Sequence, residues 1–113
     1  PQAPKLTSED LQWLEDLEST VKEELSNFDF NIEALSTKMA LSKRQIGRKV
    51  KQLVGMTPSK YIQEVRLNQA RQILENRTES SVKAVAYSIG VKDVVHFSRL
   101  FKERFGKLPS EYL

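Results

Sequence analysis

The chain carries one segment twice. The residues GMTPSKYI, from Gly55 to Ile62, return 51 positions later as GKLPSEYL, from Gly106 to Leu113. Upstream the match continues at the same offset and then at an offset of 50, because one residue is inserted in a turn. An insertion inside a helix would rotate its core face away, so the repeat predicts two copies of a helix–turn–helix unit. The matched hydrophobic positions include Ile46 with Phe97, Val50 with Phe101, Val54 with Phe105, Leu35 with Val85, Met39 with Ile89, and Ala40 with Gly90.

Helical periodicity runs through the whole chain, and no stretch alternates with the period of a strand. We therefore expect an all-α fold of about seven helices, with two helix–turn–helix units joined by a long linker helix. Side chains that cap helix N-termini and glycines that end helices set the expected boundaries. The expected helical segments are residues 7–26, 32–39, 43–54, 58–75, 82–89, 94–105 and 109–113, with N-caps at Thr7, Asn31, Ser42, Thr57, Ser81 and Asp93.

A chain of 113 residues can form one compact domain or two very small ones. We expect a linker and an acidic leader helix over residues 1–27, and the first helix–turn–helix over residues 28–56. The linker helix then covers residues 57–76, and the second helix–turn–helix covers residues 77–113. Because the chain begins with the linker-like residues 1–4 and lacks an initiator Met, we expect it to be a piece of a longer protein.

Charge is distributed unevenly along the chain, although the net charge is only +3. Residues 1–41 hold three Lys and nine acidic side chains, a net charge of −6. Residues 42–113 hold fifteen Lys or Arg and six acidic side chains, a net charge of +9. A basic body of this kind favours a polyanionic partner, while a solvated charged surface is the simpler alternative from charge alone.

Several classes of protein are not supported by the composition. The absence of Cys excludes disulfides and thiolate metal sites, and no apolar run approaches the ~20 residues of a membrane span. The single histidine, His96, has no acid–base partners in its sequence neighbourhood. We therefore predict no enzymatic activity, no cofactor, no metal site and no membrane contact for this segment.

The second helix of each predicted unit has an exposed face that is rich in basic and hydrogen-bonding side chains. A recognition helix meets base edges in the major groove with such a face, where Arg reads guanine and Gln reads adenine. Lys at the flanks neutralises phosphates without reading sequence. The off-core positions are Lys43, Arg44, Gln45, Gly47, Arg48, Lys51 and Gln52 in the first copy, and Val95, His96, Ser98, Arg99, Lys102 and Glu103 in the second.

These features resemble the double helix–turn–helix DNA-binding domain of the AraC/XylS family of transcription regulators. The second copy carries the pattern A-x-x-I-G-V-x-D-x-x-x-F-x-R-x-F-K-x-x-F-G-x-x-P-x-x-Y from Ala86 to Tyr112. The first copy carries S-x-x-x-I-x-R-K-V-K-x-L-V-G-x-T-P from Ser42 to Pro58, and the linker carries Y-I-x-x-V-R-L-x-x-A-x-x-I-L from Tyr61 to Leu74. The resemblance covers residues 28–113, which together would form one AraC-type domain.

The resemblance implies that the two recognition helices enter successive major-groove segments of duplex DNA. It implies a cytoplasmic bacterial regulator with an upstream sensor or receiver domain, as in hybrid two-component systems, and RNA polymerase as a further partner. The implied base-reading residues are Arg44, Gln45, Gly47, Arg48, Val94, Val95, His96 and Arg99. The implied phosphate contacts are Ser42, Lys43, Lys51, Lys92, Ser98 and Lys102.

The sequence departs from the family pattern at three places. Gly47 lies in mid-helix on the predicted DNA face, either as a drifted solvent site or because DNA approaches the backbone there. Val91 replaces an aromatic residue after the turn, which we interpret as a change in the core. Val94 lies on the core stripe and is expected to be partly buried, while Val95 faces outward toward a thymine methyl.

Two alternatives remain open from the sequence, a helical protein-interaction module and an RNA-binding domain. If the DNA interpretation holds, the unequal exposed faces predict that the first unit supplies most base discrimination. The binding site of one domain would then be asymmetric and non-palindromic.

Overall fold

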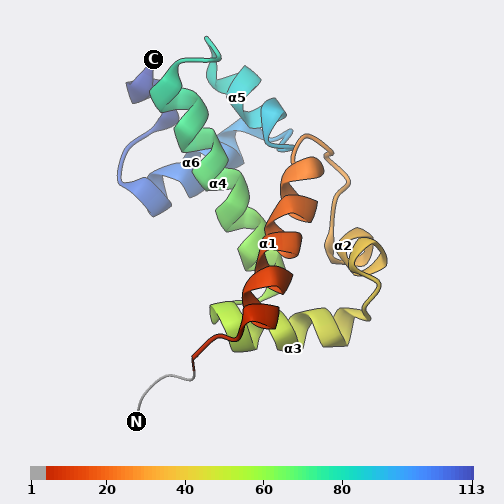
Figure 1. The fold of residues 1–113 in the computed structure, drawn as a ribbon. Coiled ribbons are helices and arrows are strands. Elements are labelled where there is room, and N and C mark those ends of the chain that lie inside the picture. The colour runs from red at the N-terminus through yellow and green to blue at the C-terminus, as the bar shows by residue number, and fades with distance from the viewer. Residues whose placement is uncertain (1–4) are drawn as a thin grey trace.

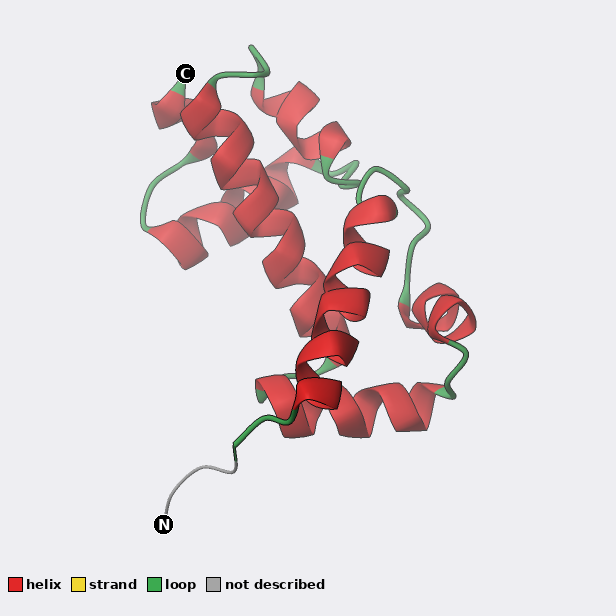
Figure 2. Cartoon of the chain, in the orientation of Figure 1, coloured by secondary structure: helices red, strands yellow, loops and turns green. Residues whose placement is uncertain are grey.

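The computed structural model describes residues 5–113, which form six α-helices, one 3-10 helix and no strand (Figures 1 and 2). The predicted all-α fold is therefore confirmed for this part of the chain, and the linker predicted at residues 1–4 lies outside the described residues. The helices are α1 (Ser8–Glu23), α2 (Ile32–Met39), α3 (Lys43–Val54), α4 (Pro58–Asn76), α5 (Val82–Ser88), α6 (Val94–Phe105) and the 3-10 helix η1 (Pro109–Tyr112).

Every predicted N-cap accepts a hydrogen bond from the backbone N–H three residues further on, at the start of its helix. These bonds satisfy backbone donors that the helix itself leaves unpaired. Thr7 and Ser42 form reciprocal capping boxes with Asp10 and Gln45. The helices α3 and α6 each end at a glycine in the left-handed conformation, Gly55 and Gly106.

Three helix ends were predicted too late. The last helix was expected to reach residue 113, but η1 ends at Tyr112. The first helix was expected to reach residue 26, but α1 ends at Glu23. Residues 24–26 form a turn, in which backbone N–H groups bond to carbonyl oxygens three residues earlier, as Asn27 N does to Glu24 O at 3.0 Å. The fifth was expected to reach residue 89, but α5 ends at Ser88. After both α1 and α5 a hydrophobic residue, Leu25 or Ile89, extends the apolar stripe past the last helical turn and is buried.

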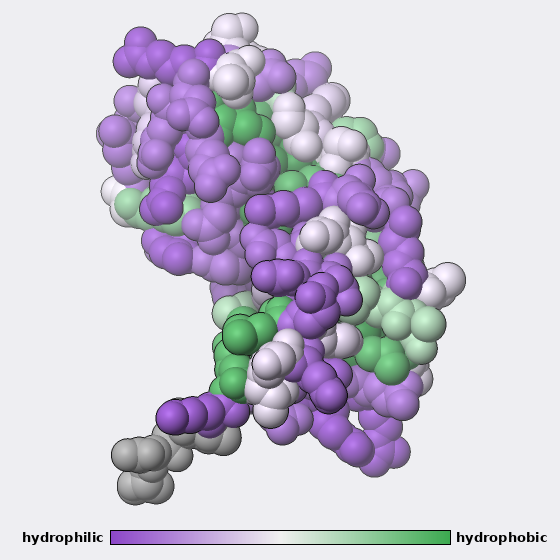
Figure 3. Space-filling model, viewed as in Figure 1, coloured by the Kyte–Doolittle hydropathy of each residue, from purple (hydrophilic) through white to green (hydrophobic). Residues whose placement is uncertain are grey.

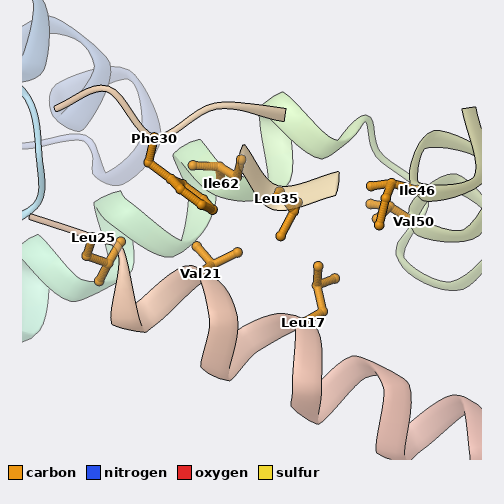
Figure 4. Packing of buried hydrophobic residues seen from close by; sticks show 8 residues of the cluster. All are labelled: Leu17, Val21, Leu25, Phe30, Leu35, Ile46, Val50 and Ile62. Atoms are coloured by element: carbon orange, nitrogen blue, oxygen red, sulfur yellow. The ribbon is translucent and has the colours of Figure 1, made fainter. Parts of the chain in front are cut away.

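Residues 5–113 contain two hydrophobic cores, one for each helix–turn–helix unit. The first core joins α1, α2, α3 and the first half of α4, and Figure 4 shows its side chains meeting between these elements. The second core joins the second half of α4 with α5 and α6. The first consists of Leu17, Val21, Leu25, Phe30, Leu35, Ile46, Val50 and Ile62, and the second of Leu67, Ala70, Leu74, Val85, Ala86, Ile89, Phe97 and Phe101.

The acidic leader helix packs directly onto the first unit. Leu17 and Val21 of α1 are fully buried in the first core, and Lys49 of α3 lies over the Trp13 ring with its Nζ 4.7 Å from the centroid. Figure 1 shows the N-terminal end of α1 crossing α3. Because α1 covers one side of α3, only the remaining face of that helix is open to a ligand.

The long helix α4 is shared by both cores and joins the two units (Figure 1). Its 19 residues give it a length of about 28 Å at 1.5 Å per residue. Ile62 near its start packs in the first core, and Leu74 near its end packs in the second. The linker helix therefore sets the distance between α3 and α6.

Candidate nucleic-acid interface

The two predicted recognition helices are equivalent in structure. Both α3 and α6 contain 12 residues, and each follows an N-cap side chain and ends at a left-handed glycine. Three exposed side chains at i, i+4 and i+7 lie on one side of each helix, opposite its core stripe. In α3 these residues are Arg44, Arg48 and Lys51, and in α6 they are Val95, Arg99 and Lys102.

The repeat offset of 51 places these exposed sets in register. Arg48 corresponds to Arg99 and Lys51 to Lys102, so two of three positions keep their charge. The third position differs, because Arg44 of α3 is matched by Val95 of α6, whose side chain is 81% exposed. A valine this exposed contributes little to the core and leaves its methyl groups free for contact with a ligand.

Gln45 differs from Arg44 and Arg48 because its side chain takes part in the capping box at the start of α3. Its Oε1 accepts a hydrogen bond from the Ser42 backbone N–H at 2.8 Å, and its own N–H donates to Ser42 Oγ at 3.1 Å. It also lines a cavity beside α1 that includes Asp10. Gln45 therefore helps to begin the helix and lies toward the side that α1 covers. Its Nε2 amide group can still donate hydrogen bonds to a ligand.

Gly47 is half-buried in the middle of α3. A Cβ built on this glycine would meet no heavy atom within 4 Å, so nothing in the folded domain requires the absence of a side chain there. Glycine in a helix interior is about 1 kcal/mol less favourable than alanine. The structure thus gives Gly47 no packing role.

At the start of α6 the predicted base-reading side chains contact one another. Asp93 caps the helix by accepting from the His96 N–H at 2.9 Å, and Arg99 Nη2 lies 2.9 Å from His96 Nδ1. Because the guanidinium can only donate, Nδ1 takes the acceptor role in this contact. Val94 is half-buried against the second core, as its place on the core stripe predicted.

The predicted phosphate contacts lie at the edges of the two recognition helices. Lys43 Nζ forms an exposed ion pair with Glu33 of α2 at 3.3 Å, and Lys92 Nζ lies 5.0 Å from the Phe28 ring centroid. Lys51 Nζ lies 3.4 Å from the Gly55 carbonyl oxygen at the end of α3. The remaining members behave differently, since Lys102 is exposed, Ser98 is half-buried, and Ser42 serves as the N-cap of α3.

One basic side chain near this surface was not among the predicted site residues. Arg66 of α4 lines a cavity of about 350 Å³ together with Lys92 and His96, between the linker helix and the start of α6. Burial lowers the pKa of the Arg66 guanidinium from its usual value. Its only sequence signal is its place in the linker-helix pattern, which carries no information about the cavity.

The part of the chain that the structure describes holds no helix long and apolar enough to cross a membrane. Within the same residues no group of three or more His, Cys, Asp or Glu side chains is placed to hold a metal ion.

The family model of the helix-turn-helix domain matches residues 35–113. Among curated proteins, the chain is 30% identical over 112 residues to histidine kinase P4 of Formosa agariphila, with 99% of the chain aligned. It is 42% identical over 79 residues, 70% of its length, to the HTH-type transcriptional activator RhaS of Escherichia fergusonii. The chain spans 8% of the length of the histidine kinase and 28% of RhaS.

Three solved structures share the fold over most of their length. An AraC-type regulator from Chromobacterium violaceum superposes with a TM-score of 0.82 at 28% identity, covering 94% of this chain and 93% of that one. The C-terminal domain of the two-component response regulator YesN from Fusobacterium nucleatum gives 0.79 at 25% identity, with coverages of 89% and 97%. The DNA-binding domain of the global transcriptional factor AdpA, solved with a target DNA, gives 0.77 at 27% identity, with coverages of 88% and 87%.

The duplicated unit, the shared linker helix and the family match over both units lead to one assignment. The chain belongs to the AraC/XylS family of transcription regulators and is the double helix–turn–helix DNA-binding domain of that family.

Proposed function

We propose that this domain binds double-stranded DNA in a sequence-specific manner, with α3 and α6 in successive major-groove segments of one duplex. The observation that carries the proposal is the equivalence of the two exposed sets, Arg44–Arg48–Lys51 and Val95–Arg99–Lys102, on helices joined by the linker helix α4. Successive major-groove segments on one side of B-DNA lie about 34 Å apart, which is comparable with the length of the spacer helix, about 28 Å.

We propose distinct roles for the residues of the two faces. Arg44 and Arg48 read bases by bidentate hydrogen bonds, and Gly47 lets the DNA approach the backbone of α3. In α6, Arg99 and His96 read bases through hydrogen bonds, and Val95 contacts a thymine methyl. Gln45 and Val94 support these helices through the cap and the core, and their base contacts are secondary. The predicted phosphate contacts are Ser42, Lys43, Lys51, Lys92, Ser98 and Lys102.

We further propose that the domain is the output module of a longer bacterial two-component regulator. The support is the match of nearly the whole chain, leader helix included, to a segment of a histidine kinase, and the likeness to the C-terminal domain of a response regulator. A sensor or receiver domain would precede α1, the regulator would act in the cytoplasm where the chromosome lies, and RNA polymerase would be its further partner.

The experiment that tests DNA binding is selection of bound duplexes from a random pool, followed by titration at two salt concentrations. We expect one asymmetric site with two unequal halves, and an affinity that falls steeply with salt because several Lys and Arg release counterions. Matched single-stranded DNA and RNA of the same sequence serve as controls. Equal or tighter binding to RNA would support the RNA-binding alternative, and no binding to any nucleic acid at low salt would support a protein-interaction module.

The exposed hydrophobic residues bear on that last alternative. The face shown in Figure 3 is mostly hydrophilic, and its hydrophobic residues emerge in small patches. Among the large exposed hydrophobic side chains, Phe28 and Tyr87 pair with each other, while Leu11 on α1, Val95 on α6 and Leu113 at the end of the chain lie on different elements. Protein interfaces are usually built on a contiguous apolar patch, which favours the nucleic-acid function for this domain.

A further inference from the structure

The loop between α1 and α2 belongs to the first unit but also reaches the second. Leu25 and Phe30 at its two ends are buried in the first core. Between them, Asn27 Nδ2 donates to Glu24 Oε2 at 3.0 Å and Asp29 N donates to Asn27 Oδ1 at 3.0 Å. Figure 1 shows this loop passing beside the end of α5. Internal hydrogen bonds and two buried anchors make it an ordered support.

The loop packs closely against Gly90, in the turn of the second unit. A Cβ on Gly90 would lie 2.2 Å from the Leu25 carbonyl oxygen and 3.1 Å from that of Asn27, so the two backbones pack too closely for any side chain. The repeat supplies an internal comparison, because the matching residue of the first unit is Ala40, which adopts the left-handed conformation at φ 55°. The turn itself thus tolerates a Cβ, and the packed loop is what requires glycine at position 90.

Side chains around Gly90 reinforce this contact. Phe28 of the loop and Tyr87 of α5 make an edge-to-face aromatic pair with centroids 5.3 Å apart, and Lys92 Nζ lies 5.0 Å from the Phe28 centroid. Arg66 of α4 donates from Nη2 to the Asn27 carbonyl oxygen at 3.3 Å. These contacts give Phe28, otherwise an exposed aromatic residue, a structural partner in the other unit.

We infer that the α1–α2 loop is a strut that fixes the second helix–turn–helix unit against the first, and that it thereby determines which half-site spacing the domain accepts. A single connecting helix leaves the units free to bend and twist about it, whereas a second connection through Gly90 removes that freedom. Phe28, Tyr87 and Gly90 are therefore positioning residues for specificity, without contact to DNA. The claim about spacing rests on the proposed function, but the claim about the strut does not.

The strut is tested without DNA by measuring the distance between the two recognition helices. Because the chain has no Cys, spin labels can be placed at Gln52→Cys and Glu103→Cys, which are exposed and outside the proposed contacts. Pulsed electron–electron double resonance should give one narrow distance distribution for the parent and at least a twofold broader one for Phe28→Ala. Leu11→Ala, which truncates another exposed hydrophobic side chain far from the loop, is the matched control and should leave the width unchanged.

Gly90→Ala provides a second perturbation, with Gly106→Ala as its control. Both glycines have φ 79°, but a Cβ at Gly106 meets nothing within 4 Å, so the control carries only the backbone strain. We expect broadening for Gly90→Ala and the parent width for Gly106→Ala. Parent widths for both Phe28→Ala and Gly90→Ala, with circular dichroism showing folded protein, would overturn the strut. If Gly90→Ala does not fold, Phe28→Ala alone decides.

Spacing is then tested on the selected duplex and on a duplex with one base pair inserted between its halves. The parent should bind the lengthened duplex at least tenfold more weakly, and Phe28→Ala should show a penalty of threefold or less, with unchanged affinity for an isolated half-site. Equal penalties would overturn the link between strut and spacing. Failure of the parent to bind any duplex would instead overturn the proposed function, and the distance widths would still decide on the strut.

Discussion

Replacing Gly47 with alanine separates the stability of α3 from its fit to DNA. Glycine inside a helix is about 1 kcal/mol less favourable than alanine, and the new Cβ would have no heavy atom within 4 Å. Gly47→Ala should therefore raise the free energy of unfolding by about 1 kcal/mol, which corresponds to roughly 4 °C in Tm for a domain of this size. Thermal denaturation followed by circular dichroism measures this gain.

The same substitution should weaken DNA binding if the DNA backbone or a base edge approaches Gly47 closely. We expect a loss of about tenfold in affinity, about 1.4 kcal/mol, in a fluorescence anisotropy titration with the selected duplex. The control is Gly55→Ala, which lies at the end of the same helix with φ 80° and should lower stability through backbone strain. A stabilised variant with unchanged affinity would refute close approach and leave Gly47 as a solvent site. If Gly47→Ala is not more stable than the parent, the argument that glycine lowers the stability of α3 would be refuted.

Three further predictions concern contacts and pH. Arg48→Ala should weaken binding by about 1–3 kcal/mol and relax the preference at one base position, as read by selection from random duplexes. Lys102→Ala should weaken binding to all duplexes alike and reduce the slope of log K against log salt by about 0.9, as read by titration over a salt series. Burial, together with Glu18, raises the pKa of Tyr61 to about 12, so its contribution to stability is present below pH 10 and is lost as the pH rises toward 12. Urea denaturation across this range should show the loss, and Tyr61→Phe should remove it.

Helix starts were predictable from the sequence because their determinants are local. An N-cap side chain accepts a hydrogen bond from an N–H only three residues away, so Asn31 or Ser81 can be recognised without the rest of the fold. The end of α1 was not predictable in the same way, since no glycine or proline follows it. The apolar stripe continues to Leu25, which lies in the turn after the helix and is buried there.

Contacts between distant segments left no signal in the sequence pattern. The packing of the α1–α2 loop on Gly90 depends on how two units come together, and the glycine alone reads as an ordinary turn residue. Gln45 shows the opposite case, in which a signal was present. Ser42 followed three residues later by Gln45 is the signature of a capping box, which explains why its amide oxygen is already engaged.

The unequal exposed faces lead to a last prediction, because one substitution makes them alike. Val95→Arg would give α6 the set Arg–Arg–Lys at i, i+4 and i+7, as in α3, and the 81% exposure of Val95 leaves room for the longer side chain. If position 95 reads a base as proposed for Arg44, the site selected by Val95→Arg should gain a guanine in its second half and approach a direct repeat of the first half. Val95→Ala, which removes apolar contact without adding donors, is the matched control and should lose preference for thymine without gaining guanine. An unchanged selected site for Val95→Arg would contradict base reading by this face, because a bidentate donor added at a true contact position cannot leave the sequence preference untouched.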